Sequence, residues 1–128
     1  MGWLKKLFGL DYPPAEVISI NDQNFKDEVR QSELPVLLDV WSPGCAPCAR
    51  LAPVVMELSR RYHGRLKVAE LNSAMAPKTA SRLRVMGTPT VIYFWKGAEK
   101  ERVVGFRGQL YHQDYLDNEL FPSIGEEH

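Results

Sequence analysis

The stretch VLLDVWSPGCAPC, residues 36–48, decides the fold and directs the search for a function. It joins an apolar run, Val36 to Val40, to Cys45 and Cys48, the only two cysteines of the 128-residue chain. A strand that leads into a C-x-x-C at the start of a helix places the first thiol near unpaired backbone N–H groups, where the helix dipole favours thiolate. The second thiol lies one helical turn away, within reach of a disulfide. A reactive dithiol is therefore the leading hypothesis.

Three other interpretations of the cysteine pair remain open. A zinc site would need two or more further ligands from the three histidines, His63, His112 and His128, which show no paired metal-ligand spacing. A structural disulfide would stabilise the fold little, because only two residues separate the cysteines and the closed loop is short. Two unreactive core thiols are the third interpretation, since free cysteine is among the most buried residue types. Each alternative leaves the pair without a role in thiol exchange.

Length and charge limit the class of protein. A chain of 128 residues can bury a working core as one domain. Lys plus Arg and Asp plus Glu both total 16, so the formal net charge is zero and no broad basic surface for nucleic acid or anionic lipid is indicated. No apolar run can span a bilayer, and residues 1–10 are too broken by Lys5, Lys6 and Gly9 for a secretory signal. We expect a cytoplasmic monomer, in a compartment where structural disulfides are rare.

Strand-like and helix-like windows alternate along the chain and predict an α/β domain. Residues 36–41 show no period-two polarity, which is typical of a central strand covered on both faces. In the last helix the expected apolar face consists of Leu110, Tyr115, Leu116 and Leu120. The expected strands are residues 17–20, 36–41, 66–71, 89–95 and 100–104, and the expected helices are residues 21–31, 46–62, 76–83 and 109–120.

Several of these residues together resemble the thioredoxin family in order and spacing. The resemblance covers roughly residues 16–120 and implies a thioredoxin fold, a central mixed sheet with helices on both faces. We expect an amphipathic extension at 1–14, a thioredoxin-like domain at 15–121 and a tail at 122–128. The residues that carry the resemblance are PVLLDVW (35–41), CAPC (45–48), Pro53, GTPTV (87–91) and Gly105.

The residue types and the resemblance suggest a protein-disulfide reductase. Cys45, nearest the helix N-terminus, would attack a substrate disulfide, and Cys48 would resolve the mixed disulfide. The redox-active Cys45–Cys48 disulfide would be the only redox group, with no metal and no cofactor. Expected partners are disulfide-containing proteins and an electron donor like thioredoxin reductase. The alternative is a non-catalytic binding module that keeps the fold.

Asp39 is the candidate proton acceptor for Cys48. A carboxylate within an apolar strand is costly to bury, and by analogy with the family it lies beneath Cys48. The alternative is a polar side chain at a strand end, facing solvent. Many thioredoxins have a lysine on the adjacent strand where this chain has Glu70. Two facing carboxylates predict a raised, coupled titration of Asp39 and Glu70.

The resemblance also implies a substrate groove. In the family the peptide bond before the matching proline is cis and the preceding residue binds substrate as an added strand, whereas base rates favour a trans proline that opens an edge strand. Gly44 replaces a tryptophan common in the family, and Ala46 replaces a glycine. The expected substrate-binding residues are Gly44, Ala46, Pro47, Thr88, Pro89, Gly105 and Phe106.

Two further features have packing or contact roles. Trp41 and Tyr93 are expected in the core, because an aromatic side chain in a buried strand contributes mainly buried area. Residues 1–10 form a short amphipathic stretch that could touch a membrane or a partner. We expect instead a capping helix or a frayed end, because two lysines add little anchoring. The residues of this stretch are Trp3, Leu4, Leu7, Phe8 and Leu10, with Lys5 and Lys6 opposite.

Overall fold

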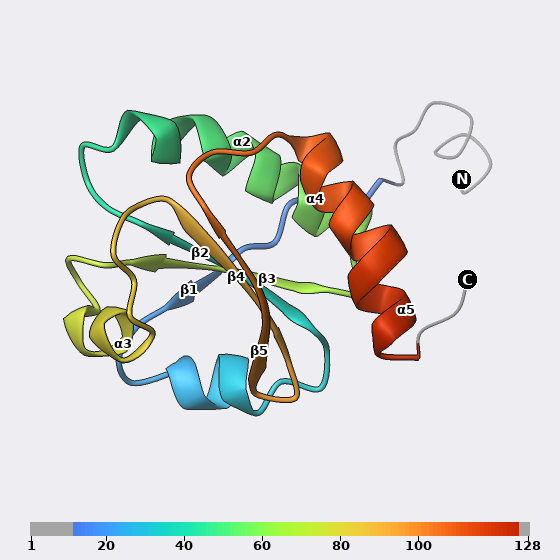
Figure 1. Ribbon diagram of the computed structural model, residues 1–128, viewed down its shortest axis with the longest axis horizontal. Coiled ribbons are helices and arrows are strands. Elements are labelled where there is room, and N and C mark those ends of the chain that lie inside the picture. Colours follow the sequence, from blue (N-terminus) through green and yellow to red (C-terminus); the bar gives the residue numbers. More distant parts are fainter. Residues whose placement is uncertain (1–11, 126–128) are drawn as a thin grey trace.

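A five-stranded mixed sheet forms the centre of the protein in this computed structural model, which describes residues 12–125 (Figure 1). The strand order is β1-β3-β2-β4-β5, so β2 lies in the middle, as predicted. β1, β3 and β2 pair in parallel, whereas β4 and β5 run antiparallel to their neighbours. The strands are β1 (Ile18–Ile20), β2 (Val36–Trp41), β3 (Lys67–Asn72), β4 (Thr90–Trp95) and β5 (Ala98–Val104).

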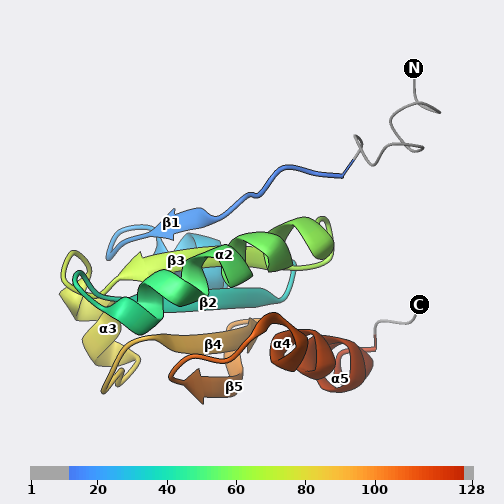
Figure 2. The same cartoon turned by 90° about the horizontal axis from the view of Figure 1, so that it is seen from above.

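Helices cover both faces of this sheet. On one face lie α2 and the run α4, η2 and α5, and on the other face lie η1 and α3 (Figures 1 and 2). The expected thioredoxin-type layering is confirmed. The helical segments are η1 (Lys26–Arg30), α2 (Ala46–Arg61), α3 (Pro77–Arg82), α4 (Gln109–Tyr115), η2 (Leu116–Leu120) and α5 (Phe121–Ser123).

The two faces of β2 belong to separate hydrophobic cores. Leu38 and Val40 pack with the cluster under η1 and α3, whereas Leu37 packs with the cluster under α2. Because successive side chains of a strand alternate in direction, Asp39 falls on the α2 face together with Leu37 and Trp41. The period of the strand thus places a carboxyl group directly beneath the helix that carries the cysteines.

Helix α2 begins at the cysteine pair. Cys45 is its N-cap residue, with extended backbone angles, and Pro47 lies in the first turn, where its missing N–H costs nothing. The helix ends at Arg61, one residue before the expected end, and Gly64 follows with a φ of +81°. The helix is held by a buried apolar side that faces the sheet, consisting of Leu51, Val55 and Leu58.

The β4–β5 hairpin brings two loops to the end of the sheet where β2 ends. Its turn, Lys96-Gly97, has φ angles of 50° and 81°, the pattern of a type I′ turn. A Cβ atom on Gly97 would lie 2.9 Å from the carbonyl oxygen of Arg30, so only glycine fits there. At the other end of the hairpin, the backbone N–H of Gly105 donates to the carbonyl of Pro89 at 2.8 Å.

The expected apolar face of the last helix is wrong in one position. Leu110 is 80% exposed, whereas Tyr115, Leu116 and Leu120 are buried as expected. The buried positions of this helical run include His112, which precedes Tyr115 by three residues and Leu116 by four. Leu110 lies two residues before His112, about 200° around a helix, and therefore points away from the core.

His112 forms a buried hydrogen bond with Tyr93. The hydroxyl of Tyr93 lies 2.6 Å from Nδ1 of His112. Burial raises the pKa of Tyr93 well above its ordinary value, so the hydroxyl keeps its proton. Nε2 of His112 has no hydrogen-bond partner among the described residues. Burial lowers the pKa of His112 to about 4.

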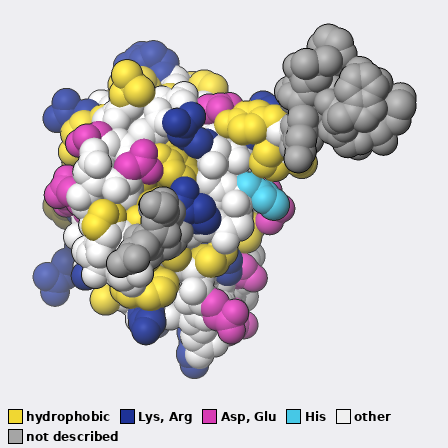
Figure 3. Space-filling model, turned by 90° about the vertical axis from the view of Figure 1, so that its right-hand side faces the viewer, with side chains coloured by type: hydrophobic (Ala, Val, Ile, Leu, Met, Phe, Trp, Pro, Cys, Tyr) yellow, Lys and Arg dark blue, Asp and Glu magenta, His cyan; other side chains and the backbone are white. Residues whose placement is uncertain are grey.

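The surface of the described residues has mixed character. On the face seen in Figure 3, at the end that carries α4 and α5, basic, acidic and hydrophobic side chains are interspersed. Within residues 12–125, no helix is both long enough and apolar enough to cross a bilayer. The expected amphipathic stretch at 1–10 lies outside the described residues.

The first prediction concerns His112→Phe and acid stability. Below pH 6.5 the unfolded chain binds a proton at His112 that the folded protein does not bind until about pH 4. The contribution of His112 to wild-type stability should therefore rise with pH between about 4 and 6.5, by up to about 3 kcal/mol. The variant should lose that slope in urea unfolding measured at several pH values. His112→Phe also loses the hydrogen bond to Tyr93 at every pH, so the change of stability with pH, and not stability at one pH, is the measurement. The control His63→Phe alters an exposed residue and should keep the wild-type slope.

Candidate active site

Cys45 and Cys48 are joined by a disulfide at the N-terminus of α2, with their Cα atoms 5.2 Å apart. The backbone N–H of Cys48 points at Sγ of Cys45, at a distance of 3.2 Å. Cys45 is half-buried and Cys48 is buried, as expected for an attacking and a resolving thiol. When the bond is reduced, this N–H and the helix dipole favour a negative charge on Sγ of Cys45.

The surroundings of Cys45 and Cys48 test two of the other interpretations, a zinc site and a pair of unreactive core thiols. Among residues 12–125, no three His, Cys, Asp or Glu side chains come together as a metal site. His112 is bonded to Tyr93 within the core, His63 is exposed beyond the end of α2, and His128 lies outside the described residues. The two cysteines also differ from inert core thiols, because they form a disulfide and Cys45 is partly exposed. The arrangement is that of an accessible disulfide at a helix N-terminus.

The Thr88–Pro89 loop faces this disulfide. The peptide bond between the two residues is cis, as the resemblance implies, and the trans alternative is wrong. The carbonyl oxygen of Thr88 lies 3.6 Å from Sγ of Cys45, and the hydroxyl of Thr88 lies 2.6 Å from that of Ser42. With Gly105 bonded to Pro89 on its other side, the loop is fixed against the sulfur from two directions.

Of the other expected substrate-binding residues, three lie next to Cys45 along the chain and one follows Gly105. Gly44 is exposed, adopts a φ of +74° that favours glycine, and has open space where a Cβ would lie. Ala46 and Pro47 form the first turn of α2. Phe106 is partly exposed after Gly105, and the guanidinium of Arg50 lies 5.8 Å from the centre of its ring.

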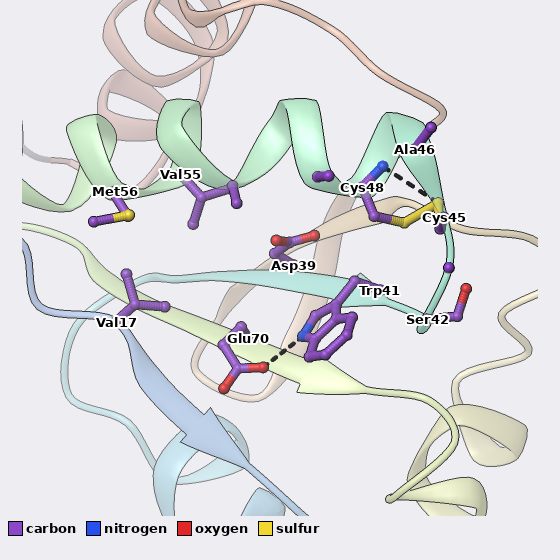
Figure 4. A pocket seen from close by; sticks show the side chains of 13 residues that line it. Val17, Asp39, Trp41, Ser42, Cys45, Ala46, Cys48, Val55, Met56 and Glu70 are labelled. Carbon is purple, nitrogen blue, oxygen red and sulfur yellow. Dashed lines mark hydrogen bonds between the residues drawn. A yellow bond between two sulfur atoms is a disulfide. The ribbon is translucent and has the colours of Figure 1, made fainter.

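Asp39 lies beneath α2 and is only 5% exposed, so the solvent-facing alternative is wrong. Its Oδ1 atom has no hydrogen-bond partner among the described residues. Burial, with a smaller contribution from the charge of Glu70, raises the pKa of Asp39 to about 7. The raised pKa of Asp39 agrees in direction with the expected effect of two neighbouring carboxylates. Figure 4 shows Asp39 on the strand below the cysteine-bearing end of α2.

Glu70 is the direct neighbour of Asp39 in the sheet, where β2 and β3 pair in parallel. Its Oε1 accepts a hydrogen bond from the indole N–H of Trp41 at 2.6 Å (Figure 4). Trp41, expected as a packing residue, thus also makes a polar contact that was not expected. A signal was present, because Trp41 and Asp39 are two residues apart on one strand and therefore share a face.

A groove of about 710 Å³ extends from the disulfide along α2. Figure 4 shows α2 on one side and β3 with Glu70 on the other. The groove was not expected from the sequence, although Ala49, Ala52 and Met56 follow helical spacing on the exposed side of α2. Its lining consists of Val17, Asp39, Trp41, Ser42, Gly44, Cys45, Ala46, Cys48, Ala49, Ala52, Val55, Met56 and Glu70.

This arrangement provides the parts that thiol–disulfide exchange requires. One sulfur is reachable from solvent and lies where thiolate is favoured, and a second lies within bonding distance of it. A buried carboxyl group that titrates near neutral pH lies below the pair. The cysteine pair carries two electrons as a dithiol and gives them up when the disulfide forms, so the exchange needs no added redox group.

Comparisons with known proteins agree with this geometry. The family model described as "Thioredoxin" matches residues 16–117. "Thioredoxin" of Synechocystis sp. is 45% identical over 86 residues, which are 67% of this chain and 80% of that protein. "Thioredoxin" of Rickettsia conorii is 32% identical over 102 residues, 80% of this chain and 97% of the relative.

A plant relative is longer than the matched region. "Thioredoxin M-type, chloroplastic" of Spinacia oleracea is 37% identical over 107 residues, 84% of this chain. The match spans only 59% of the spinach protein. The chain belongs to the thioredoxin family, and its thioredoxin domain carries the cysteine pair of a thiol–disulfide oxidoreductase.

Proposed function

We propose that the chain reduces protein disulfides through Cys45 and Cys48. The observation that carries the proposal is the position of Cys45, a partly exposed residue at the N-terminus of α2 whose Sγ lies 3.6 Å from the carbonyl oxygen of Thr88 in the cis Thr88–Pro89 loop. An extended substrate segment can pair with the backbone of this loop while its disulfide meets the sulfur. Thr88, Pro89, Gly105 and Phe106 would shape that contact.

The reaction balances in two exchanges. The Cys45 thiolate attacks one sulfur of the substrate disulfide, which forms a mixed disulfide and releases the other substrate sulfur as thiolate. Cys48, after losing its proton, attacks Sγ of Cys45, which forms the Cys45–Cys48 disulfide and releases the second substrate thiolate. Two electrons pass to the substrate, and the two substrate thiolates take up two protons. A dithiol donor, such as a thioredoxin-reductase-like protein, returns two electrons to the pair.

Asp39 would serve as the proton acceptor for Cys48. Cys48 is buried, and desolvation opposes its ionisation, so a base nearby lowers the barrier to the second exchange. A carboxyl group with a pKa of about 7 can take a proton and return it at neutral pH. Both residues line the same groove, so a water molecule in the groove can relay the proton between them.

The setting of this activity is also a proposal. A reducing compartment such as the cytoplasm would keep the pair ready to attack, although spinach and pea relatives are named as chloroplastic proteins. We retain a catalytic domain at 15–121, flanked by an extension at 1–14 and a tail at 122–128. The domain would act as a monomer on disulfide-containing proteins.

The second prediction tests the order of the two thiols. Cys45→Ser should abolish reduction of insulin disulfides with dithiothreitol as donor, because the remaining thiol, that of Cys48, is buried. Cys48→Ser should still attack but should accumulate a mixed disulfide, visible by mass spectrometry of the intact protein. Wild-type rates in Cys45→Ser would contradict the proposal. A native chain without turnover, together with partner capture by a Cys45→Ser/Cys48→Ser variant, would favour a binding module.

The third prediction concerns Asp39→Asn. The amide cannot accept a proton, so decay of the mixed disulfide should slow by about 10- to 100-fold near pH 7, measured in single turnovers. Between pH 3.8 and about 7 the folded protein holds a proton on Asp39 that the unfolded chain releases, so the contribution of Asp39 to stability falls as pH rises, opposite in sign to that of His112. The variant should therefore be more stable than wild type at pH 9, by up to about 4 kcal/mol.

Asp27→Asn provides a matched control for this change, because Asp27 is an exposed carboxylate in η1. It should alter neither the decay of the mixed disulfide nor the pH dependence of unfolding. Unchanged single-turnover decay in Asp39→Asn would remove Asp39 from the mechanism.

The fourth prediction concerns the influence of Glu70 on Asp39. Glu70→Gln removes a neighbouring negative charge and keeps the length of the side chain, so the pKa of Asp39 should fall from about 7 but stay above its ordinary value, because burial is the larger cause. Glu70→Lys should lower the pKa of Asp39 further. NMR titration of the Asp39 carboxyl carbon measures both changes. An identical titration curve in Glu70→Lys would show that the charge of Glu70 does not reach Asp39.

A further inference from the structure

The groove along α2 shares Cys45, Cys48 and Asp39 with the proposed reaction but extends along α2 away from the cis-proline loop. It begins at Cys45 and Gly44 and ends at Val17 and Met56, and its lining includes neither the Thr88–Pro89 loop nor Gly105. A substrate segment bonded to Cys45 therefore has two surfaces within reach. One is the cis-proline loop, and the other is this groove.

The wall that α2 contributes is apolar and open. Ala49 and Ala52 have small side chains that leave the hollow free, and Met56 is 50% exposed. Met56 follows Cys48 by about two helical turns, so the groove runs for about 12 Å. This length matches three or four residues of an extended peptide. An exposed apolar surface of this kind gains free energy when a partner's apolar side chains cover it.

The charges in the groove have one sign. Asp39 and Glu70 are its only titratable side chains apart from the bonded cysteines, and no Lys, Arg or His belongs to the lining. Glu70 is half-buried on β3 at the side opposite α2 (Figure 4). A carboxylate beside apolar surface favours a cationic group, because partial burial reduces solvent screening of the attraction.

Gly44 leaves the passage from the sulfur to the groove open. It directly precedes Cys45, is exposed, and has no heavy atom within 4 Å of the position of a Cβ. A chain bonded to Cys45 can therefore cross Gly44 without meeting a side chain. The continuity of the groove with the reactive sulfur favours a substrate segment as its occupant.

We propose that this groove binds the part of a substrate protein next to its reactive cysteine, and selects segments that combine a large apolar side chain with a lysine or arginine. The inference rests on the proposed disulfide reduction and adds a substrate class to it. The apolar side chain would lie along Ala52 and Met56, and the cationic group would pair with Glu70.

The experiment compares two peptide disulfides in which the cysteine is flanked on both sides by leucine and either lysine or glutamate. With dithiothreitol as donor, wild-type kcat/KM should be about fivefold higher for the lysine peptide. Glu70→Lys should reverse the preference. The ratio between peptides cancels any common change in thiol reactivity or in Asp39. As a control, Glu119→Lys makes the same charge change at an exposed position of η2 outside the groove lining. It should keep the wild-type ratio.

A second variant tests the apolar part of the groove. Ala52→Phe should fill the hollow without disturbing the core, because Ala52 is exposed. It should lower kcat/KM for the leucine–lysine peptide several-fold and should leave a serine–lysine peptide nearly unchanged. Equal losses for the two peptides would contradict apolar recognition at this site.

The outcomes separate this inference from the proposed function. Equal kcat/KM for the lysine and glutamate peptides in wild type would overturn the inference and leave disulfide reduction intact. No reduction of either peptide would overturn both. A lysine preference that appears only after removal of residues 1–10 would assign the groove to that segment instead. This outcome is included because Tyr12 lies near the groove: its hydroxyl donates a hydrogen bond at 2.6 Å to Glu57, the residue after Met56.

Discussion

The junction between β2 and α2 is the constraint on which the rest of the site depends. β2 is buried on both faces, so its position is fixed by two cores, and the helix that follows can start only at the end of the sheet. Because Cys45 caps that helix, its sulfur receives the backbone N–H of Cys48 and the field of the aligned peptide dipoles. Two rigid elements therefore position the sulfur, and the β4–β5 hairpin brings the cis-proline loop to it.

Local sequence periodicity was enough to predict these elements. Residues 36–41 read as a central strand because they lack alternation, and α2 follows from apolar positions at helical spacing between an N-terminal C-x-x-C and Gly64. The last helix shows where such reasoning fails. Leu110 is a large apolar residue and was expected in the core, but it is exposed and His112 is buried instead. The imidazole of His112 can be buried because it forms a hydrogen bond with Tyr93.

The parts of the site that sequence did not predict depend on contacts between distant segments. The bond from Trp41 to Glu70 requires the register of β2 against β3, and the two residues are 29 positions apart. The groove requires the height of α2 above the sheet and the small side chains of Ala49 and Ala52 together. The spacing of residues within β2 or within α2 marks one side of each feature, but it does not identify the partner on the other element. The cysteines and the buried carboxyl were recognisable because each departs from its own local pattern.

Glu70 connects the chemistry of the site with its surface. Its charge contributes to the raised pKa of Asp39 on one side, and on the other it is the carboxylate available to a cation in the groove. A bound cation would offset the charge that Glu70 exerts on Asp39 and would lower the pKa of Asp39 while the substrate is attached. Asp39 would then be a weaker base but would be ionised in a larger fraction of molecules, and below pH 7 this larger fraction favours removal of the Cys48 proton. Substrate binding and the resolving step would thus be coupled through one pair of neighbouring carboxylates.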